Sequence, residues 1–116
     1  MALESGRLSP TVATLLAQSD HEIFVSGASL WEITIKTALG KLRLPVSLET
    51  LVEKLREENQ VVTLPILASH VYAHATLASV HRDPFDRMLV AQAHSDGLLL
   101  VTRDPNIKQY AVSTIW

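Results

Sequence analysis

Apolar residues along this chain form two kinds of pattern, short aliphatic runs and longer stretches in which they recur at helical spacing. The short runs predict strands at 21–26, 61–64, 98–101 and 112–116. Helical spacing and capping residues predict helices near 11–20, 27–36, 48–58, 66–78 and 84–94, with a short helix after Pro105. Because helices separate all the strands, we expect an α/β fold with a mostly parallel sheet and right-handed crossovers.

The stretch from Asp83 to Asp104 carries the strongest local signals. Asp83 before Pro84 predicts a helix start, because an Asp side chain accepts first-turn amide bonds and proline suits the first helical position. Asp86 then takes the third helical position. Residues 98–101 have no polar member, as in a strand covered on both faces, and Asp104 follows them. Helix N-termini and strand C-termini share one edge of an α/β sheet, so Asp86 and Asp104 should be neighbours there.

The helix at 27–36 brings a third acid to that edge, because Glu32 is predicted in its first turn. Carboxylate oxygens and water hold hard cations such as Mg²⁺ or Mn²⁺, and a cation so held polarises a phosphate and activates water. Glu32, Asp86 and Asp104 are therefore candidate catalytic residues and metal ligands. The core-facing residues of the same helix are predicted to be Leu30, Trp31 and Ile33.

Each acid also has a purely structural alternative. The sequence from Ser29 to Glu32 matches a capping box, in which Glu32 would bond back to the amide of the N-cap residue. Asp86 could simply complement the helix dipole, and Asp104 could cap the short helix that follows it. Asp83 is expected to be a helix cap, with an outer-shell position at the metal as its alternative.

Hydroxyl and basic side chains are predicted around the three acids. Ser26 and Thr102 fall at the same edge and could orient a metal-bound water, although capping is the commoner use of such residues. Four cations could hold the phosphates of a substrate strand: Arg82, Arg87, Arg103 and Lys36. Their alternative role is to balance the nearby carboxylates.

Composition narrows the possible functions. With 116 residues, 47% of them hydrophobic, the chain is long enough for one domain with its own core. A formal net charge of −2 gives no global basic field, so a nucleic-acid partner would need a local patch. The absence of cysteine excludes disulfides, a thiolate nucleophile and a Cys-ligated zinc. Without a signal segment or a membrane-length apolar run, the expected location is the cytoplasm.

Two long motifs stand in order along the chain. The first is Val-Ser-Gly-Ala-Ser-Leu-Trp-Glu-Ile at 25–33, followed by Leu-Gly-Lys-Leu at 39–42. The second is His-Arg-Asp-Pro-Phe-Asp-Arg-Met-Leu-Val-Ala-Gln-Ala at 81–93, followed by Val-Thr-Arg-Asp at 101–104. Together they resemble the PIN domain nucleases, in particular the VapC-like toxins of bacterial toxin–antitoxin pairs. The resemblance spans essentially the whole chain and implies a three-layer fold around a mostly parallel central sheet.

By this resemblance, Glu32, Asp86 and Asp104 take the places of three acidic metal ligands of the family. The resemblance implies a Mg²⁺- or Mn²⁺-dependent endoribonuclease that cuts RNA, forms a homodimer and is silenced by a cognate antitoxin. Family members normally begin with a strand of the Leu-Leu-Asp-Thr-His type, which is central in the sheet and supplies the first catalytic Asp. We therefore expect residues 1–116 to form a single, N-terminally truncated PIN-like domain, with that strand either lost or encoded upstream of Met1.

Three functional hypotheses follow. The leading one is a toxin ribonuclease, weak or inactive if the first Asp is missing. The alternative is a non-catalytic module with the PIN fold that binds an antitoxin or RNA, and a third is an unrelated α/β domain that binds a small ligand at the same edge. A gap at the centre of the sheet further predicts that strands 21–26 and 98–102 pair directly or that another chain fills the space.

Overall fold

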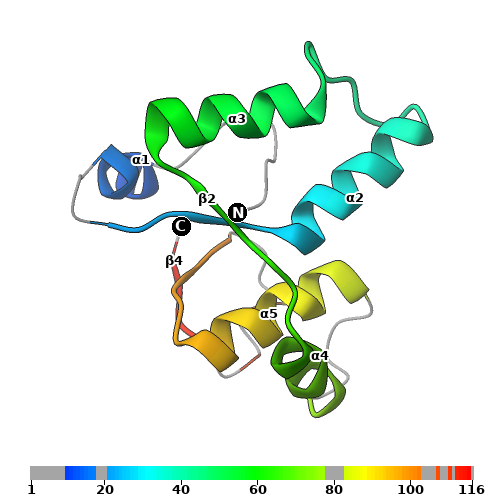
Figure 1. The fold of residues 1–116 in the computed structure, drawn as a ribbon. Coiled ribbons are helices and arrows are strands. Elements are labelled where there is room, and N and C mark those ends of the chain that lie inside the picture. Colours follow the sequence, from blue (N-terminus) through cyan, green and yellow to red (C-terminus); the bar gives the residue numbers. More distant parts are fainter. Residues whose placement is uncertain are drawn as a thin grey trace.

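The structure is a computed structural model that describes residues 10–17, 21–77, 83–102, 107, 110 and 112–115. Helices and short strands follow one another in the predicted order (Figure 1). The helices are α1 (Pro10–Ala17), α2 (Gly27–Ala38), α3 (Leu48–Asn59), α4 (Ala68–Ala75) and α5 (Pro84–Asp96). The strands are β1 (Phe24–Ser26), β2 (Val62–Leu64), β3 (Leu100–Val101) and β4 (Thr114–Ile115). The short helix predicted after Pro105 falls largely outside the described ranges, in which no helix is long and apolar enough to cross a membrane.

Within the described residues, the strands form two separate parallel pairs. Phe24 of β1 lies opposite Val62 of β2, and Leu100 of β3 lies opposite Thr114 of β4. The α/β class and the parallel pairing confirm the prediction from the sequence. Each paired segment is shorter than its apolar run, because the run reflects burial whereas the strand requires a hydrogen-bonded neighbour.

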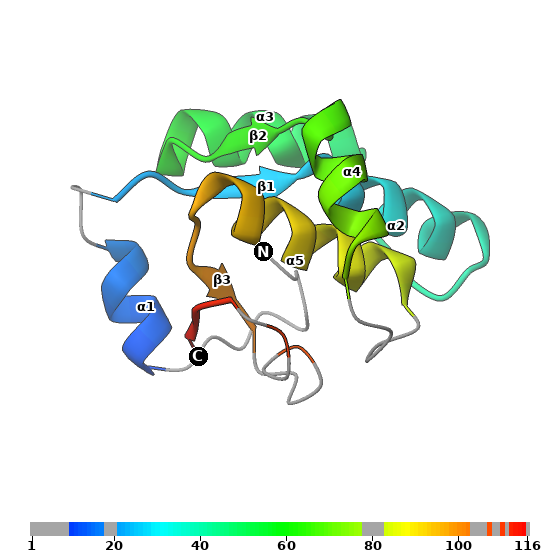
Figure 2. The same cartoon turned by 90° about the horizontal axis from the view of Figure 1, so that it is seen from below.

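Helix α5 lies at the centre of the molecule, between the β1–β2 pair and β3 (Figure 2). It packs most extensively against α4, and it also contacts α2 and β3. Its inner face contributes Val90 and Ala93 to the main hydrophobic cluster, whose other buried members are Leu100, Ile107 and Tyr110. Helix α5 thus contacts β3 and is bonded through Gln92 to Ser26 at the carboxyl end of β1, although the two strands do not pair with each other.

Local start and stop signals in the sequence are confirmed. The Asp83 side chain accepts the Phe85 N–H at 2.9 Å and caps α5, and Pro84 takes the first helical position. Gly97 ends that helix at a φ of 65°, which an L side chain adopts only under strain. Ser47 caps α3 by accepting the Thr50 N–H at 3.2 Å.

Predictions of which side chains face inward were less accurate. Trp31 is 59% exposed, because its ring packs edge to face on the Phe85 ring instead of entering the core. The helical spacing at 66–78 also predicts that Val71 and Leu67, which proves to be the N-cap residue of α4, face inward, but they are 48% and 50% exposed. The buried position of that helix is His70, whose ring finds polar partners on the neighbouring elements. A fully paired polar side chain thus takes the place that periodicity assigned to apolar residues.

Candidate functional site

The junction between β1 and α2 forms one side of the candidate site. Ser26 ends the strand and is also the N-cap residue of the helix, where its Oγ accepts the Ala28 N–H at 3.0 Å. Because the strand passes into the helix without a loop, Ser29 lies inside the first turn and is buried. The predicted capping box from Ser29 to Glu32 is therefore wrong, and Glu32 lies one turn further along α2 than predicted.

This correction removes the capping alternative for Glu32. Its carboxylate instead forms an ion pair with Lys36, with 3.6 Å between Oε2 and Nζ, one helical turn apart. The Glu32 side chain is 26% exposed and that of Lys36 is 52% exposed, so the pair lies at the surface of α2, within reach of solvent. An exposed pair of this kind contributes little to stability, and its carboxylate can exchange partners.

Helix α5 forms the other side of the site. Asp86 lies at the third helical position, as predicted, and is partly buried. The negative charge there also complements the N-terminus of the helix, so the dipole alternative for Asp86 stands beside the metal-ligand one. Trp31 and Phe85 pack edge to face, with 5.1 Å between ring centroids and 80° between ring planes. Since these rings directly precede Glu32 and Asp86 in sequence, their contact brings the segments that carry both acids together.

The third predicted acid, Asp104, lies outside the described residues, as do Arg82 and Arg103. Among the residues that are described, no group of three or more His, Cys, Asp or Glu side chains could hold a metal ion. The described part of the chain thus contributes two carboxylates from adjoining helices, Glu32 and Asp86. Carboxylate oxygens suit a hard divalent cation, but a complete coordination sphere would need further oxygen ligands.

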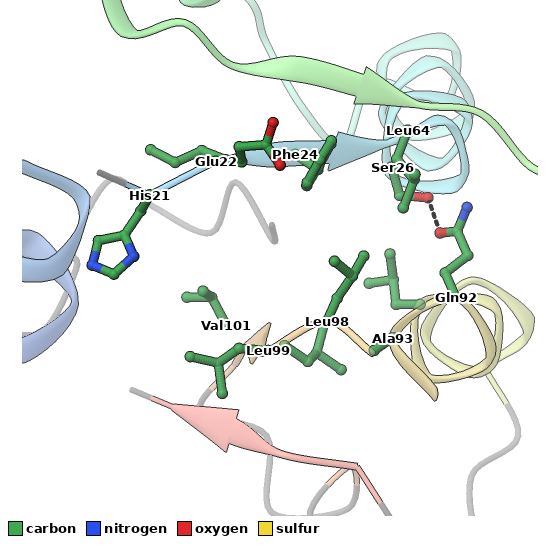
Figure 3. Close-up of a pocket in the computed structure, with 13 residues that line it drawn as sticks. His21, Glu22, Phe24, Ser26, Leu64, Gln92, Ala93, Leu98, Leu99 and Val101 are labelled. Carbon is green, nitrogen blue, oxygen red and sulfur yellow. Dashed lines mark hydrogen bonds between the residues drawn. The ribbon is translucent and has the colours of Figure 1, made fainter. Parts of the chain in front are cut away.

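The two predicted hydroxyl residues are both buried. Thr102 directly follows β3 and is 7% exposed. The Ser26 Oγ also donates to Oε1 of Gln92 at 2.5 Å, a bond drawn in Figure 3. Because Ser26 caps α2 and bonds to α5 at once, it joins the two helices that carry Glu32 and Asp86. Its role beside a metal-bound water stays a prediction.

Gln92 belongs to a buried polar network that the sequence patterns did not reveal. Its Nε2 donates to the Pro65 carbonyl at 3.3 Å and lies 3.4 Å from Nδ1 of His70. The same Nδ1 accepts the Leu67 N–H at 3.0 Å, which places the ring proton on Nε2, where it faces Oδ2 of Asp96 at 3.0 Å. The one signal available in the sequence was a glutamine flanked by apolar residues on the inner face of α5.

Arg87 is tied to the interior of the protein. Its Nη1 donates to the Tyr110 hydroxyl at 3.3 Å, and its Nη2 lies 3.5 Å from the carbonyl oxygens of His74 and Leu77. These contacts connect α5 to the end of α4 and to the segment around Tyr110. The guanidinium therefore has a structural role, and phosphate binding by Arg87 stays a prediction.

The comparisons with known proteins agree with this architecture. The model of the PIN domain family matches residues 3–113, which is nearly the whole chain. No curated protein and no solved structure matches. PIN domains are generally nucleases, so the match supports a nuclease-type function. This chain belongs to the PIN domain family.

Proposed function

We propose that this chain is a metal-dependent endoribonuclease, a VapC-like toxin that hydrolyses RNA phosphodiester bonds in the cytoplasm. The observation that carries the proposal is the placement of Glu32 and Asp86 on two helices that adjoin through Trp31 and Phe85. Neither carboxylate serves as a helix N-cap, because Ser26 and Asp83 fill those positions.

In this proposal Glu32, Asp86 and Asp104 hold one Mg²⁺ or Mn²⁺ ion. The cation supplies Lewis acidity, which lowers the pKa of water and stabilises charge on a phosphate. Lys36 forms an ion pair with Glu32 and would be a candidate ligand for a phosphate of the RNA. Arg82 and Arg103 are further candidates for the RNA backbone, with Asp83, Ser26 and Thr102 as outer-shell residues.

The proposal includes two partners besides RNA. A homodimer and a cognate antitoxin fit the VapC-like subtype, in which a peptide of the antitoxin enters the groove that holds the acids. The competing hypothesis is a non-catalytic PIN-fold module that binds an antitoxin or RNA without cutting it. It is favoured by one observation, that the described residues contain no group of three or more side chains that could hold a metal ion.

Cleavage of a fluorescently labelled RNA with Mg²⁺ or Mn²⁺ separates these hypotheses. We expect metal-dependent cleavage that falls at least a hundredfold in Glu32→Gln, Asp86→Asn and Asp104→Asn, since each removes an anionic ligand. Glu57→Gln, an exposed carboxyl on α3, is the matched control and should cleave like the parent chain. Cleavage that persists in all three site variants would point to a contaminant and contradict the assignment.

Calorimetric titration with Mn²⁺ tests the same site without depending on activity. The parent chain should bind the cation, and each site variant should bind it more weakly. If the parent chain binds RNA but shows neither cation binding nor cleavage, the non-catalytic module is the correct function.

A further inference from the structure

A cavity of about 180 Å³ separates the two strand pairs. Figure 3 shows residues of β1 along one side of it and residues around β3 along the other. Helix α5 also lines the cavity, through Leu89, Gln92 and Ala93. Most of the other lining side chains are apolar: Ile23, Phe24, Leu64, Leu98, Leu99 and Val101.

Both strands present a backbone edge to this cavity. The Ile23 carbonyl accepts the Val62 N–H at 2.9 Å, so the backbone groups of Ile23 face β2. Successive residues of a strand direct these groups to opposite edges, which turns those of Phe24 and Ser26 toward the cavity. In the second pair, the Leu100 N–H donates to the Ser113 carbonyl at 3.0 Å. By the same alternation, the backbone groups of Leu99 and Val101 face away from β4 and toward β1.

Within the described residues, these edges of β1 and β3 have no hydrogen-bonded partner strand. Each sheet has two strands, so neither β1 nor β3 has a second hydrogen-bonded neighbour there. Leu99 is 48% exposed although it belongs to a wholly apolar run. An apolar slot between two rows of backbone donors and acceptors is complementary to one kind of ligand, an extended polypeptide.

An acidic residue at one end of the slot favours a basic residue in the incoming segment. Glu22 lines the cavity just before β1 and is exposed. Among the described residues that line the cavity, it is the only Asp or Glu. A lysine or arginine at the matching end of an incoming segment would therefore be favoured over an acid.

We propose that the slot between β1 and β3 accepts an extended aliphatic segment of a partner protein, with a basic residue beside Glu22, as an added strand. The added strand would bond to both edges at once and join the two pairs into one sheet. Its side chains would replace solvent beside Leu99 and Val101. This proposal rests on the fold alone and does not depend on nuclease activity.

Peptide binding provides the test. The probe is the acetylated hexapeptide KVLVLT, and its control is the same peptide with N-methyl groups on alternate amides, which keeps the side chains but removes one edge of hydrogen-bond donors. We expect the unmodified peptide to bind in calorimetry and the methylated one to bind at least tenfold more weakly. Equal binding of the two peptides, or no binding of the unmodified one, would overturn the proposal.

Amide hydrogen exchange locates the bound peptide. Exchange should slow at least tenfold at Phe24, Ser26, Leu99 and Val101 when the peptide binds, because their amides gain partners. The Leu100 amide, which is already bonded to β4, serves as the internal reference and should change less. Protection of all these amides alike would place the peptide elsewhere and refute insertion.

Two variants complete the experiment. Leu99→Asn should weaken peptide binding about tenfold, because it removes an aliphatic side chain from the slot. Val46→Asn changes a similarly exposed aliphatic residue that does not line the slot and should bind like the parent chain. Light scattering identifies the competing occupant: a stable dimer whose slot amides are protected without peptide would show that a second copy fills the slot, and the partner-strand proposal would be wrong.

Discussion

His70 offers the sharpest test of what holds α4 on α5. The ring is fully buried, with Nδ1 accepting the Leu67 N–H and Nε2 facing Asp96, both at 3.0 Å. Truncation to alanine removes both bonds and leaves a cavity of imidazole size. Large-to-alanine changes in cores cost about 2–5 kcal/mol, and each lost hydrogen bond contributes about 1 kcal/mol. We expect His70→Ala to lower the free energy of unfolding by about 4 kcal/mol.

Urea unfolding followed by circular dichroism measures this change. At roughly 4 °C per kcal/mol for a chain of this size, the Tm should fall by about 15 °C. His70→Asn separates the two bonds, because the asparagine Oδ1 can replace Nδ1 as acceptor for Leu67 but cannot reach Asp96. We expect it to cost about 2 kcal/mol, roughly half of the alanine effect.

His94→Ala is the matched control, since His94 is exposed near the end of α5 and should change stability by less than about 0.5 kcal/mol. A loss below about 1 kcal/mol in His70→Ala would refute the structural role of the network. If His70→Asn were as unstable as His70→Ala, the bond to the Leu67 amide would contribute nothing.

Three further predictions concern the ends and surface of helices. Asp83→Ala removes the acceptor for the Phe85 N–H and should cost about 1 kcal/mol in urea unfolding, whereas Asp83→Asn keeps an acceptor and should cost less. Gly97→Ala forces a side chain into the left-handed region and should cost about 1 kcal/mol by the same assay, with Gly97→Asn less damaging; equal stability of parent and alanine variant would contradict this. A hydrogen bond from Arg56 lowers the pKa of Glu53, so the small stabilisation is present at neutral pH and is lost as acid protonates Glu53; Arg56→Ala should raise the NMR titration midpoint of Glu53.

Local signals were the part of the fold that could be predicted from the sequence. Asp83-Pro84 and Gly97 bound α5 because capping and the positive φ of glycine depend on neighbouring residues alone. The start of α2 was misplaced for a related reason. Ser26 and Ser29 are both suitable caps, and only the end of β1 decides between them.

The polar network could not be predicted because its partners are distant in sequence. His70 bonds with Asp96, and Ser26 bonds with Gln92, across different elements. Periodicity assigns burial to apolar residues. It therefore predicted that Leu67 and Val71 face the core and did not predict the burial of His70. A polar residue can occupy a core position only when tertiary contacts satisfy it, and those contacts are not visible in a local pattern.

The network and the candidate site meet at Ser26. Its hydroxyl fixes the first turn of α2 through the Ala28 amide and is itself held by Gln92 of α5. Glu32 and Asp86 lie on those two helices, so the relative position of the acids depends on a bond that neither acid makes. Gln92 is buried, so loss of its bond to Ser26 would leave an unpaired amide oxygen and would cost free energy. In this chain the relative position of the helices that carry Glu32 and Asp86 therefore depends in part on a buried neutral pair, and the local sequence signals set only where each helix begins.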